Sequence, residues 1–382
     1  MDIIDPIFNL HKIKFDILDK WNIVDKSISR ANVYVNLDNI FKMLITPRLN
    51  NFIQASASID SDTDKYMKLV SRNIVSNVIN IGQHYRLYLA KNNIESRIII
   101  YWDNPFAIPD SYINSKYIPT YRGDYLDKYH PNMENAHVIS IIQDAMEFCE
   151  KCIPYVNEVY LIKSGIVEGS LIPYLLDKEV YSKDGSKTKN FIVSTSTYEL
   201  SYTDYGFTVL VPSVRKKDPY FVNSTNAIEV LKKRSKVSTT LSVKSNFVEF
   251  IISMLGDHDR NIPSITGVGV ATILKIISQA IEKGLISEDT KDINMLSDIL
   301  KSDYKDIFYR NYHCINLVHQ FNDLEALDTH KIISQLVDNY DESTLKEMNE
   351  KYFKLSPIEI IRPKSEQVLY DYNPYSSIFS GR

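Results

Sequence analysis

The hydrophobic positions of the chain recur with two spacings, which predict strands in some segments and helices in others. Short runs rich in β-branched residues predict strands at the start of 31–44, at 97–102, at 158–166, at the start of 191–200 and at 205–212. Helical spacing predicts helices within 50–95, within 133–155 and within 246–339. The mixture predicts an α/β fold, with polar side chains following several of the strands, where ligands bind in open α/β sheets.

One stretch, residues 254–275, joins two apolar helical runs through a polar turn. In order it contains Gly256-Asp257, Asp259, Asn261, Pro263 and Gly267-Val268-Gly269. A Gly-x-Gly turn at a helix start leaves backbone N–H groups without intrahelical partners, and these groups suit a phosphate. Asp257 and Asp259 precede the turn and could hold a cation. An ordinary turn between two core helices is the simpler alternative, but the three motifs together favour phosphate binding.

The 382-residue chain has a net charge of −4, so it is not basic overall. Any surface that binds nucleic acid must therefore be a local basic region. The segment 213–243 carries the dense basic residues Arg215, Lys216, Lys217, Lys232, Lys233, Arg234 and Lys236. Such a run is either a solvated face or a track for a phosphate backbone, and the sequence leaves both interpretations open.

Cysteine content and hydrophobicity exclude several classes of protein. Three cysteines do not make a disulfide framework, and Cys149-x-x-Cys152 has neither a second pair nor a nearby histidine for zinc. No apolar run reaches the roughly 18–20 residues of a membrane span, and the first residues lack a basic signal-peptide region. We therefore expect a folded cytoplasmic protein, in the host cytoplasm if the protein is viral or from a phage.

These motifs resemble the flap endonuclease / 5′→3′ exonuclease family, in particular its phage members. Residues 256–269 are similar to that family's helix–three-turn–helix motif, Gly-Asp-x-x-Asp-Asn-Ile-Pro-Gly-Val-x-Gly-Ile-Gly, and 308–311 resembles its Phe-x-Arg-Asn helix. The resemblance implies a central, mostly parallel sheet flanked by helices, as in PIN-like domains, and a C-terminal helix-hairpin-helix subdomain. The predicted divisions are an N-terminal extension (1–30), the PIN-like domain (31–245), the helical subdomain (246–345) and a C-terminal tail (346–382).

The resemblance also implies a two-metal site built from carboxylates, and this chain has lost most of them. The aligned acids that remain are Asp103, Glu168 and Asp257. The aligned positions that no longer carry an acid are Asn36, Ser170, Leu171, Ser196, Tyr198 and Arg260. Asp38, Glu199 and Asp259 are neighbouring carboxylates that could substitute if the alignment shifts by one residue, although the strand direction predicts that Glu199 points away. Three ligands could hold one Mg²⁺ or Mn²⁺ weakly, but Arg260 puts a positive charge where a cation should lie. We predict that two-metal catalysis is lost or strongly reduced.

Residues 116–124 resemble a Leu-Pro-x-Tyr-Lys-Gly element whose Tyr and Lys face the scissile phosphate. Tyr121 could stack on a base and Arg122 keeps the charge, although a loop aromatic beside a solvated arginine explains them equally well. Together with the turn and the basic run, they complete the predicted nucleic-acid contacts. These contacts are Tyr121, Arg122, Lys232, Lys233, Arg234, Gly267, Val268, Gly269 and Lys275.

Three functions follow from these patterns. The favoured one is a non-catalytic protein that binds branched or single-stranded DNA through its backbone, or acts as a scaffold, in a viral or phage replication or nucleoprotein complex. The second is an active, divergent 5′-nuclease that uses Mg²⁺ or Mn²⁺. The third is a structural subunit without nucleic-acid contact. The tail, around 370–379, could dock a protein partner, and no membrane contact is expected.

Overall fold

The computed structural model describes most of the central part of the chain. The described residues are 27–37, 84–103, 113–121, 139–145, 159–164, 171–178, 188–212, 219–325 and 359–361, with single positions or pairs within 39–43, within 71–82 and at 147. For residues 102–103, 113, 159–164, 175, 324–325 and 359–361 the backbone alone is described. The statements below concern these residues.

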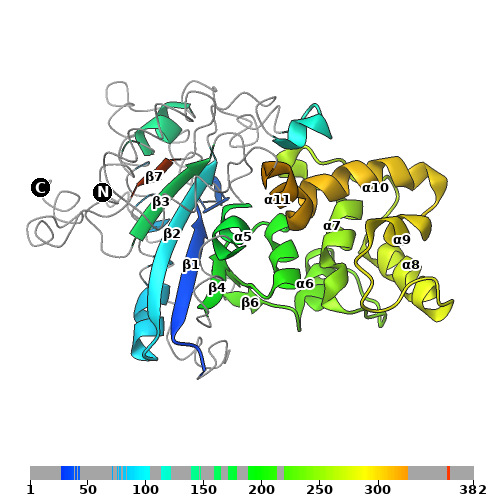
Figure 1. Ribbon diagram of the computed structural model, residues 1–382, viewed down its shortest axis with the longest axis horizontal. Helices are drawn as coiled ribbons and strands as arrows, with labels where there is room; N and C mark the ends of the chain where they lie inside the picture. Colours follow the sequence, from blue (N-terminus) through cyan, green and yellow to red (C-terminus); the bar gives the residue numbers. More distant parts are fainter. Residues whose placement is uncertain are drawn as a thin grey trace, which may run out of the picture.

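A seven-stranded sheet forms one side of the molecule, with strand order β6-β5-β4-β1-β2-β3-β7 (Figure 1). Its strands are β1 (Arg30–Asn36), β2 (Glu95–Asp103), β3 (Val159–Ser164), β4 (Thr188–Val193), β5 (Thr208–Val211), β6 (Tyr220–Val222) and β7 (Glu359–Ile361). The five strands from β5 to β3 are parallel, and β6 and β7 pair antiparallel at the two edges. The predicted mostly parallel α/β sheet is confirmed.

The central strands of the sheet are buried. In β1 every residue from Ala31 to Asn36 is buried, as expected for the middle of a parallel sheet. The two polar residues of this buried run have partners. Asn32 donates from Nδ2 to Asn190 Oδ1 of β4 at 3.0 Å, and Asn36 lies at the carboxyl end of the strand. The polar positions of β1 therefore connect it sideways to its neighbour or lie at the end where a site can form.

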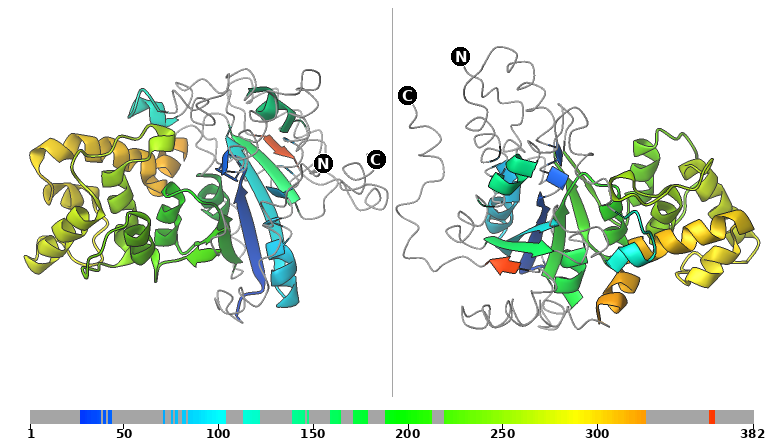
Figure 2. Two further views of the ribbon diagram at one scale, coloured as in Figure 1. Left: turned by 180° about the vertical axis from the view of Figure 1, so that it is seen from behind. Right: turned by 90° about the horizontal axis from the view of Figure 1, so that it is seen from above.

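A helical subdomain lies beside the sheet, on the side of β4 and β6 (Figures 1 and 2). The α-helices are α5 (Ile172–Leu176), α6 (Ala227–Arg234), α7 (Val248–Leu255), α8 (Val270–Glu282), α9 (Ile293–Asp298), α10 (Ser302–Ile315) and α11 (Leu317–Glu325). Short 3₁₀ helices are η3 (Ile113–Lys116), η7 (Tyr198–Tyr205), η8 (Ser245–Phe247) and η9 (His258–Arg260). No described helix is both long enough and apolar enough to cross a membrane.

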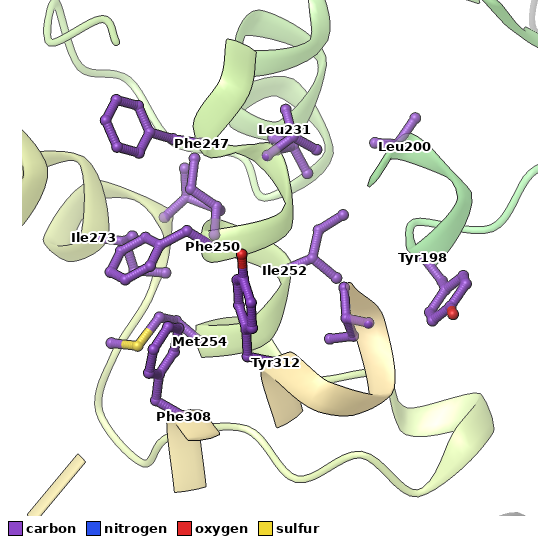
Figure 3. Packing of buried hydrophobic residues seen from close by; sticks show 14 of the residues in the cluster. Tyr198, Leu200, Leu231, Phe247, Phe250, Ile252, Met254, Ile273, Phe308 and Tyr312 are labelled. Atoms are coloured by element: carbon purple, nitrogen blue, oxygen red, sulfur yellow. The ribbon is translucent and has the colours of Figure 1, made fainter. Parts of the chain in front are cut away.

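Helix α7 is the centre of the helical core, because almost all of its residues are buried. Phe250 of α7 faces Phe308 of α10 with ring centroids 5.1 Å apart, and Tyr312 lies 5.4 Å from Phe308. Ile273 of α8 packs on the same cluster (Figure 3). The apolar runs on either side of the predicted turn are therefore the helices that build this core.

Several contacts join the sheet side of the chain to the helical subdomain, and two sets of them lie away from the turn between α7 and α8. The first attaches η3 to α10 and α11, where the Tyr117 ring stacks on His313 with centroids 4.6 Å apart. Lys116 Nζ lies 2.7 Å from Asp323 Oδ2, and Asn114 Nδ2 donates to Gln320 Oε1 at 3.3 Å. Segment 113–121 thus packs against the helical subdomain, although it follows β2 in sequence.

The second set is a buried carboxyl pair, Asp204 of η7 and Glu249 of α7. Glu249 Oε1 accepts from the Tyr205 hydroxyl at 2.8 Å and from the Leu317 amide at 3.2 Å, and Oε2 accepts from Asn316 Nδ2 at 2.6 Å. Asp204 Oδ2 accepts from the Glu249 amide at 3.2 Å. Burial raises the pKa of Glu249 to about 7 and raises the pKa of Asp204 well above its ordinary value, and the charge of Glu249 raises that of Asp204 further.

Candidate metal centre and nucleic-acid interface

The turn between α7 and α8 is a closed hairpin whose backbone depends on one glycine. Gly256 has φ 69°, and a Cβ at this position would lie 2.6 Å from the Pro263 carbonyl carbon. Asp257 and Ile262 exchange two backbone hydrogen bonds of 2.9 Å, and Asn261 between them takes the left-handed conformation at φ 57°. The predicted helix–turn–helix arrangement is therefore present, and the Gly-Asp and Asn-Ile-Pro motifs form the hairpin.

The glycine turn that follows is open to solvent. Gly267 has φ 77°, and nothing lies within 4 Å of a Cβ added at Gly267 or Gly269. Val268 is 7% exposed, and its amide donates to Ile265 O at 3.1 Å. Gly269 is the N-cap of α8 and is exposed, and no side chain caps the first amides of the helix. Lys275 lies exposed one turn further along α8.

Arg260 lies among the positions where the family resemblance implies acids. Its side chain is 6% exposed, and Nη1 lies 3.2 Å from Asp257 Oδ2 and 3.5 Å from Ser196 Oγ. The guanidinium carbon stands 4.1 Å above the centroid of the Tyr198 ring. At two positions where the resemblance implies acids, Ser196 provides a hydroxyl and Tyr198 an aromatic face, and both contact Arg260.

Asp259 also has a basic partner. Lys42 Nζ lies 2.6 Å from Asp259 Oδ1. Burial alone would raise the pKa of Asp259, but the hydrogen bond and charge of Lys42, with the charges of Arg260 and His258, bring it below its usual range. Both acids of the hairpin, Asp257 and Asp259, are therefore ionically paired within the chain.

The Glu199 side chain points toward the carboxyl ends of β1 and β2. Its side chain is fully buried, and Oε1 accepts hydrogen bonds from Asn36 Nδ2 at the end of β1 and from the Tyr101 hydroxyl of β2. The expectation that Glu199 points away is wrong, because η7 starts directly after the β4 loop and turns the carboxylate under β1. Burial raises the pKa of Glu199, and the charge of Arg260 with hydrogen bonds from Ser194, Tyr101 and Asn36 opposes that rise.

Several predicted ligands lie outside the described side chains. Asp38, Arg122, Glu168 and Ser170 lie outside the described residues, and of Asp103 only the backbone is described, at the end of β2 beside Ser164 of β3. Their roles stay predictions. Leu171 is buried immediately before α5, so this position, where the resemblance implies an acid, contributes to packing. Among the described residues, no group of three or more His, Cys, Asp or Glu side chains is placed to hold a metal ion.

Two of the predicted nucleic-acid contacts, Tyr121 and Lys232, are buried, and a third, the half-buried Arg234, is bonded within the chain. The Tyr121 side chain is fully buried in the same apolar cluster as Ile118, so its ring offers no face for base stacking in this structure. Lys232 is 5% exposed and pairs with Glu229 at 2.6 Å. Arg234 Nη1 donates to the Thr195 carbonyl and to Thr197 Oγ1, each at 3.2 Å. Among the predicted basic contacts in the described residues, Lys233 and Lys275 lie at the surface.

Sequence reasoning missed two residues of this region. Asn39 Oδ1 accepts hydrogen bonds from the Thr195 amide at 2.7 Å and from the Thr195 hydroxyl at 2.8 Å, which ties the end of β1 to the end of β4. Lys42 was missed because its partner Asp259 lies 217 positions away, and no local pattern connects them. Asn39 had a signal, since it is a polar residue three positions after the end of the predicted first strand, where side chains of an open α/β sheet meet.

Comparisons with known proteins show a likeness of fold. No protein-family model matches the chain, and no curated protein gives a significant match. Among solved structures, the chain is similar to the bacteriophage T5 flap endonuclease, crystallised as a pseudo-enzyme–product complex with DNA and metal ions, with a TM-score of 0.48 and 13% identity over 85% of this chain and 99% of that chain. It is also similar to the T5 5′-exonuclease with bound zinc, with a TM-score of 0.46, 13% identity and the same coverage.

Proposed function

We propose that this chain is a DNA-binding or scaffold protein of flap endonuclease / 5′-exonuclease-like fold in which two-metal cleavage is lost or strongly reduced. The observation that carries the proposal is that the acids of the hairpin already have cations from the chain, Arg260 on Asp257 and Lys42 on Asp259. Two-metal hydrolysis needs several free carboxylate oxygens to hold two ions a few ångströms apart. The described residues do not bring together enough unpaired carboxylates to hold two divalent ions.

Arg260 cannot give up its place by losing a proton, because an arginine side chain stays charged in proteins. Its guanidinium is also fixed on two sides, by Asp257 and by the ring of Tyr198. A divalent cation at Asp257 would lie within a few ångströms of this charge, in a region where burial weakens solvent screening. Metal binding at this position therefore requires Arg260 to leave a contact that stabilises the fold.

The DNA-binding part of the proposal rests on the open turn. Gly267 and Gly269 are exposed, and the uncapped start of α8 presents amide groups and the positive end of the helix dipole to solvent. Lys275 and Lys233 add exposed positive charge. Such contacts are made with phosphates rather than with bases, so the binding should be insensitive to sequence and sensitive to salt.

A labelled 5′-flap duplex incubated with the protein and Mn²⁺ tests both parts. We expect a band shift that weakens as salt is raised, without cleavage, because the hairpin acids are already paired. Cleavage that disappears in Asp103→Ala would instead establish an active divergent nuclease. Absence of any shift at low salt would establish a structural subunit that does not contact DNA.

A further inference from the structure

The last carbonyl groups of α7 have partners outside the helix. The carbonyls of the final turn of a helix lack intrahelical donors and need other partners when they are buried. Ile252 O accepts from the Gly256 amide at 2.8 Å, and Met254 O accepts from the Ile265 amide at 3.1 Å. The carbonyl between them, Ser253 O, accepts from the side chain of Asn311 at 2.8 Å. Asn311 is therefore a side-chain cap for α7, delivered from α10.

The same amide group also contacts the far side of the hairpin. Asn311 Nδ2 donates to Pro263 O at 2.6 Å, so its two N–H bonds bridge the end of α7 and the segment that leads to the glycine turn. Asn311 is fully buried. A buried amide with both protons used is fixed in orientation, and both carbonyls would lose a partner without it.

Helix packing fixes the position from which Asn311 acts. Phe308, three residues earlier, packs on Phe250 of α7, and Tyr312 follows in the same apolar cluster (Figure 3). The α10 backbone beside Asn311 is thus held against α7. This core fixes the distance between α10 and the hairpin. The hydrogen bond from the Asn311 amide to Pro263 O then fixes the position of Pro263 relative to α10.

Three residues separate Pro263 from the glycine turn, and the middle one, Ile265, is hydrogen-bonded at both its amide and its carbonyl. The Ile265 amide is bonded to Met254 O, and the Val268 amide is bonded to Ile265 O. We infer that Asn311 is a positioning residue for the Gly267–Gly269 turn: it holds the hairpin so that the exposed glycines and the uncapped first amides of α8 meet a phosphate. The inference rests on the proposed DNA binding and identifies a residue that touches no DNA itself.

Asn311→Leu tests the inference, with Asn32→Leu as its matched control. Leucine has the same branching and number of side-chain heavy atoms and removes the amide without adding charge. Asn32 is also buried, at 2% exposure, and its amide also donates to another residue, but it lies in β1. We expect Asn311→Leu to weaken binding of the 5′-flap duplex at least tenfold and to reduce the slope of log Kd against log salt by about one phosphate contact. Asn32→Leu should keep the wild-type slope.

Hydrogen exchange provides a readout that does not depend on DNA. In Asn311→Leu the amides of Ile265 and Val268 should exchange at least tenfold faster, whereas the amide of Ile277 in the middle of α8 should keep its protection. Wild-type exchange at both hairpin amides would overturn the inference, and so would a wild-type salt slope in the folded variant. If the wild-type protein binds no DNA, the proposed function fails, and the exchange result alone decides whether Asn311 positions the turn. If Asn311→Leu does not fold, Asn311→Ser, which leaves room for a water at the two carbonyls, takes its place in both measurements.

Discussion

Replacing Arg260 by methionine is expected to lower the free energy of unfolding by about 3–5 kcal/mol at pH 7, because removal of one partner leaves a buried charge without compensation. Asp257, whose side chain is 11% exposed, would lose its salt bridge. The fully buried Glu199 would lose the charge that opposes the rise of its pKa. Methionine fills a similar volume over the Tyr198 ring, so lost packing contributes little to the difference.

Urea denaturation of the wild type and the variant measures this loss, and Arg310→Met is the control. Arg310 is exposed on α10, so its replacement should change the free energy of unfolding by no more than about 0.5 kcal/mol. A loss for Arg260→Met as small as that of the control would show that Arg260 does not act as the counter-charge of this site. The proposal that the chain supplies its own cation would then be wrong.

Stability is expected to fall by roughly 2–3 kcal/mol as the pH rises from about 4.5 to about 7. Burial raises the pKa of Glu249 from 4.5 to about 7, so the folded state holds a proton over this interval that the unfolded state has released. The unfolded state then binds fewer protons, and the free energy of unfolding decreases with pH until Glu249 is ionised in both states. Lys291 is the nearby cation that partly offsets this effect, and Asp204 is the nearby acid that strengthens it.

Asp204→Asn tests the origin of this pH dependence. Asp204 Oδ2 accepts from the Glu249 amide, and Oδ1 has no hydrogen-bond partner among the described residues. An asparagine keeps the acceptor and removes the second charge, so the variant should be more stable than the wild type at pH 8 and should show a smaller decrease between pH 5 and pH 8. Tyr174, Tyr205 and Tyr312 also face the pair, but their raised pKa values keep them neutral throughout this range. Equal pH profiles for wild type and variant would contradict this assignment.

The features that the sequence predicted correctly depend on neighbouring residues. The β-branched runs of β1 and β2 and the apolar helices on either side of Gly256 are visible as local patterns, because burial of both faces or of one stripe imposes a period on the sequence. The hairpin was predictable for the same reason, since Gly256, Asn261 and Gly267 occupy backbone conformations that few other residues adopt.

The features that sequence reasoning missed depend on residues far apart in the chain. The direction of Glu199 follows from how η7 leaves β4, and the pairing of Lys42 with Asp259 joins residues 217 positions apart. Tyr121 looked like an exposed loop aromatic because its loop is polar, but segment 113–121 packs on the helical subdomain and buries the ring. The polar residues around an aromatic side chain do not show whether its loop packs against another part of the fold.

The attachment of segment 113–121 to α10 and α11 affects how the chain can be divided. Tyr117 stacks on His313, and Thr120 O accepts from Asn261 Nδ2 of the hairpin at 2.9 Å. A cut at 245, between the predicted PIN-like domain and the helical subdomain, would expose the buried face of this segment on one fragment and the matching face of α10 and α11 on the other. We expect the two fragments to be insoluble when expressed separately and to associate when co-expressed, so the two halves should be treated as one cooperative folding unit.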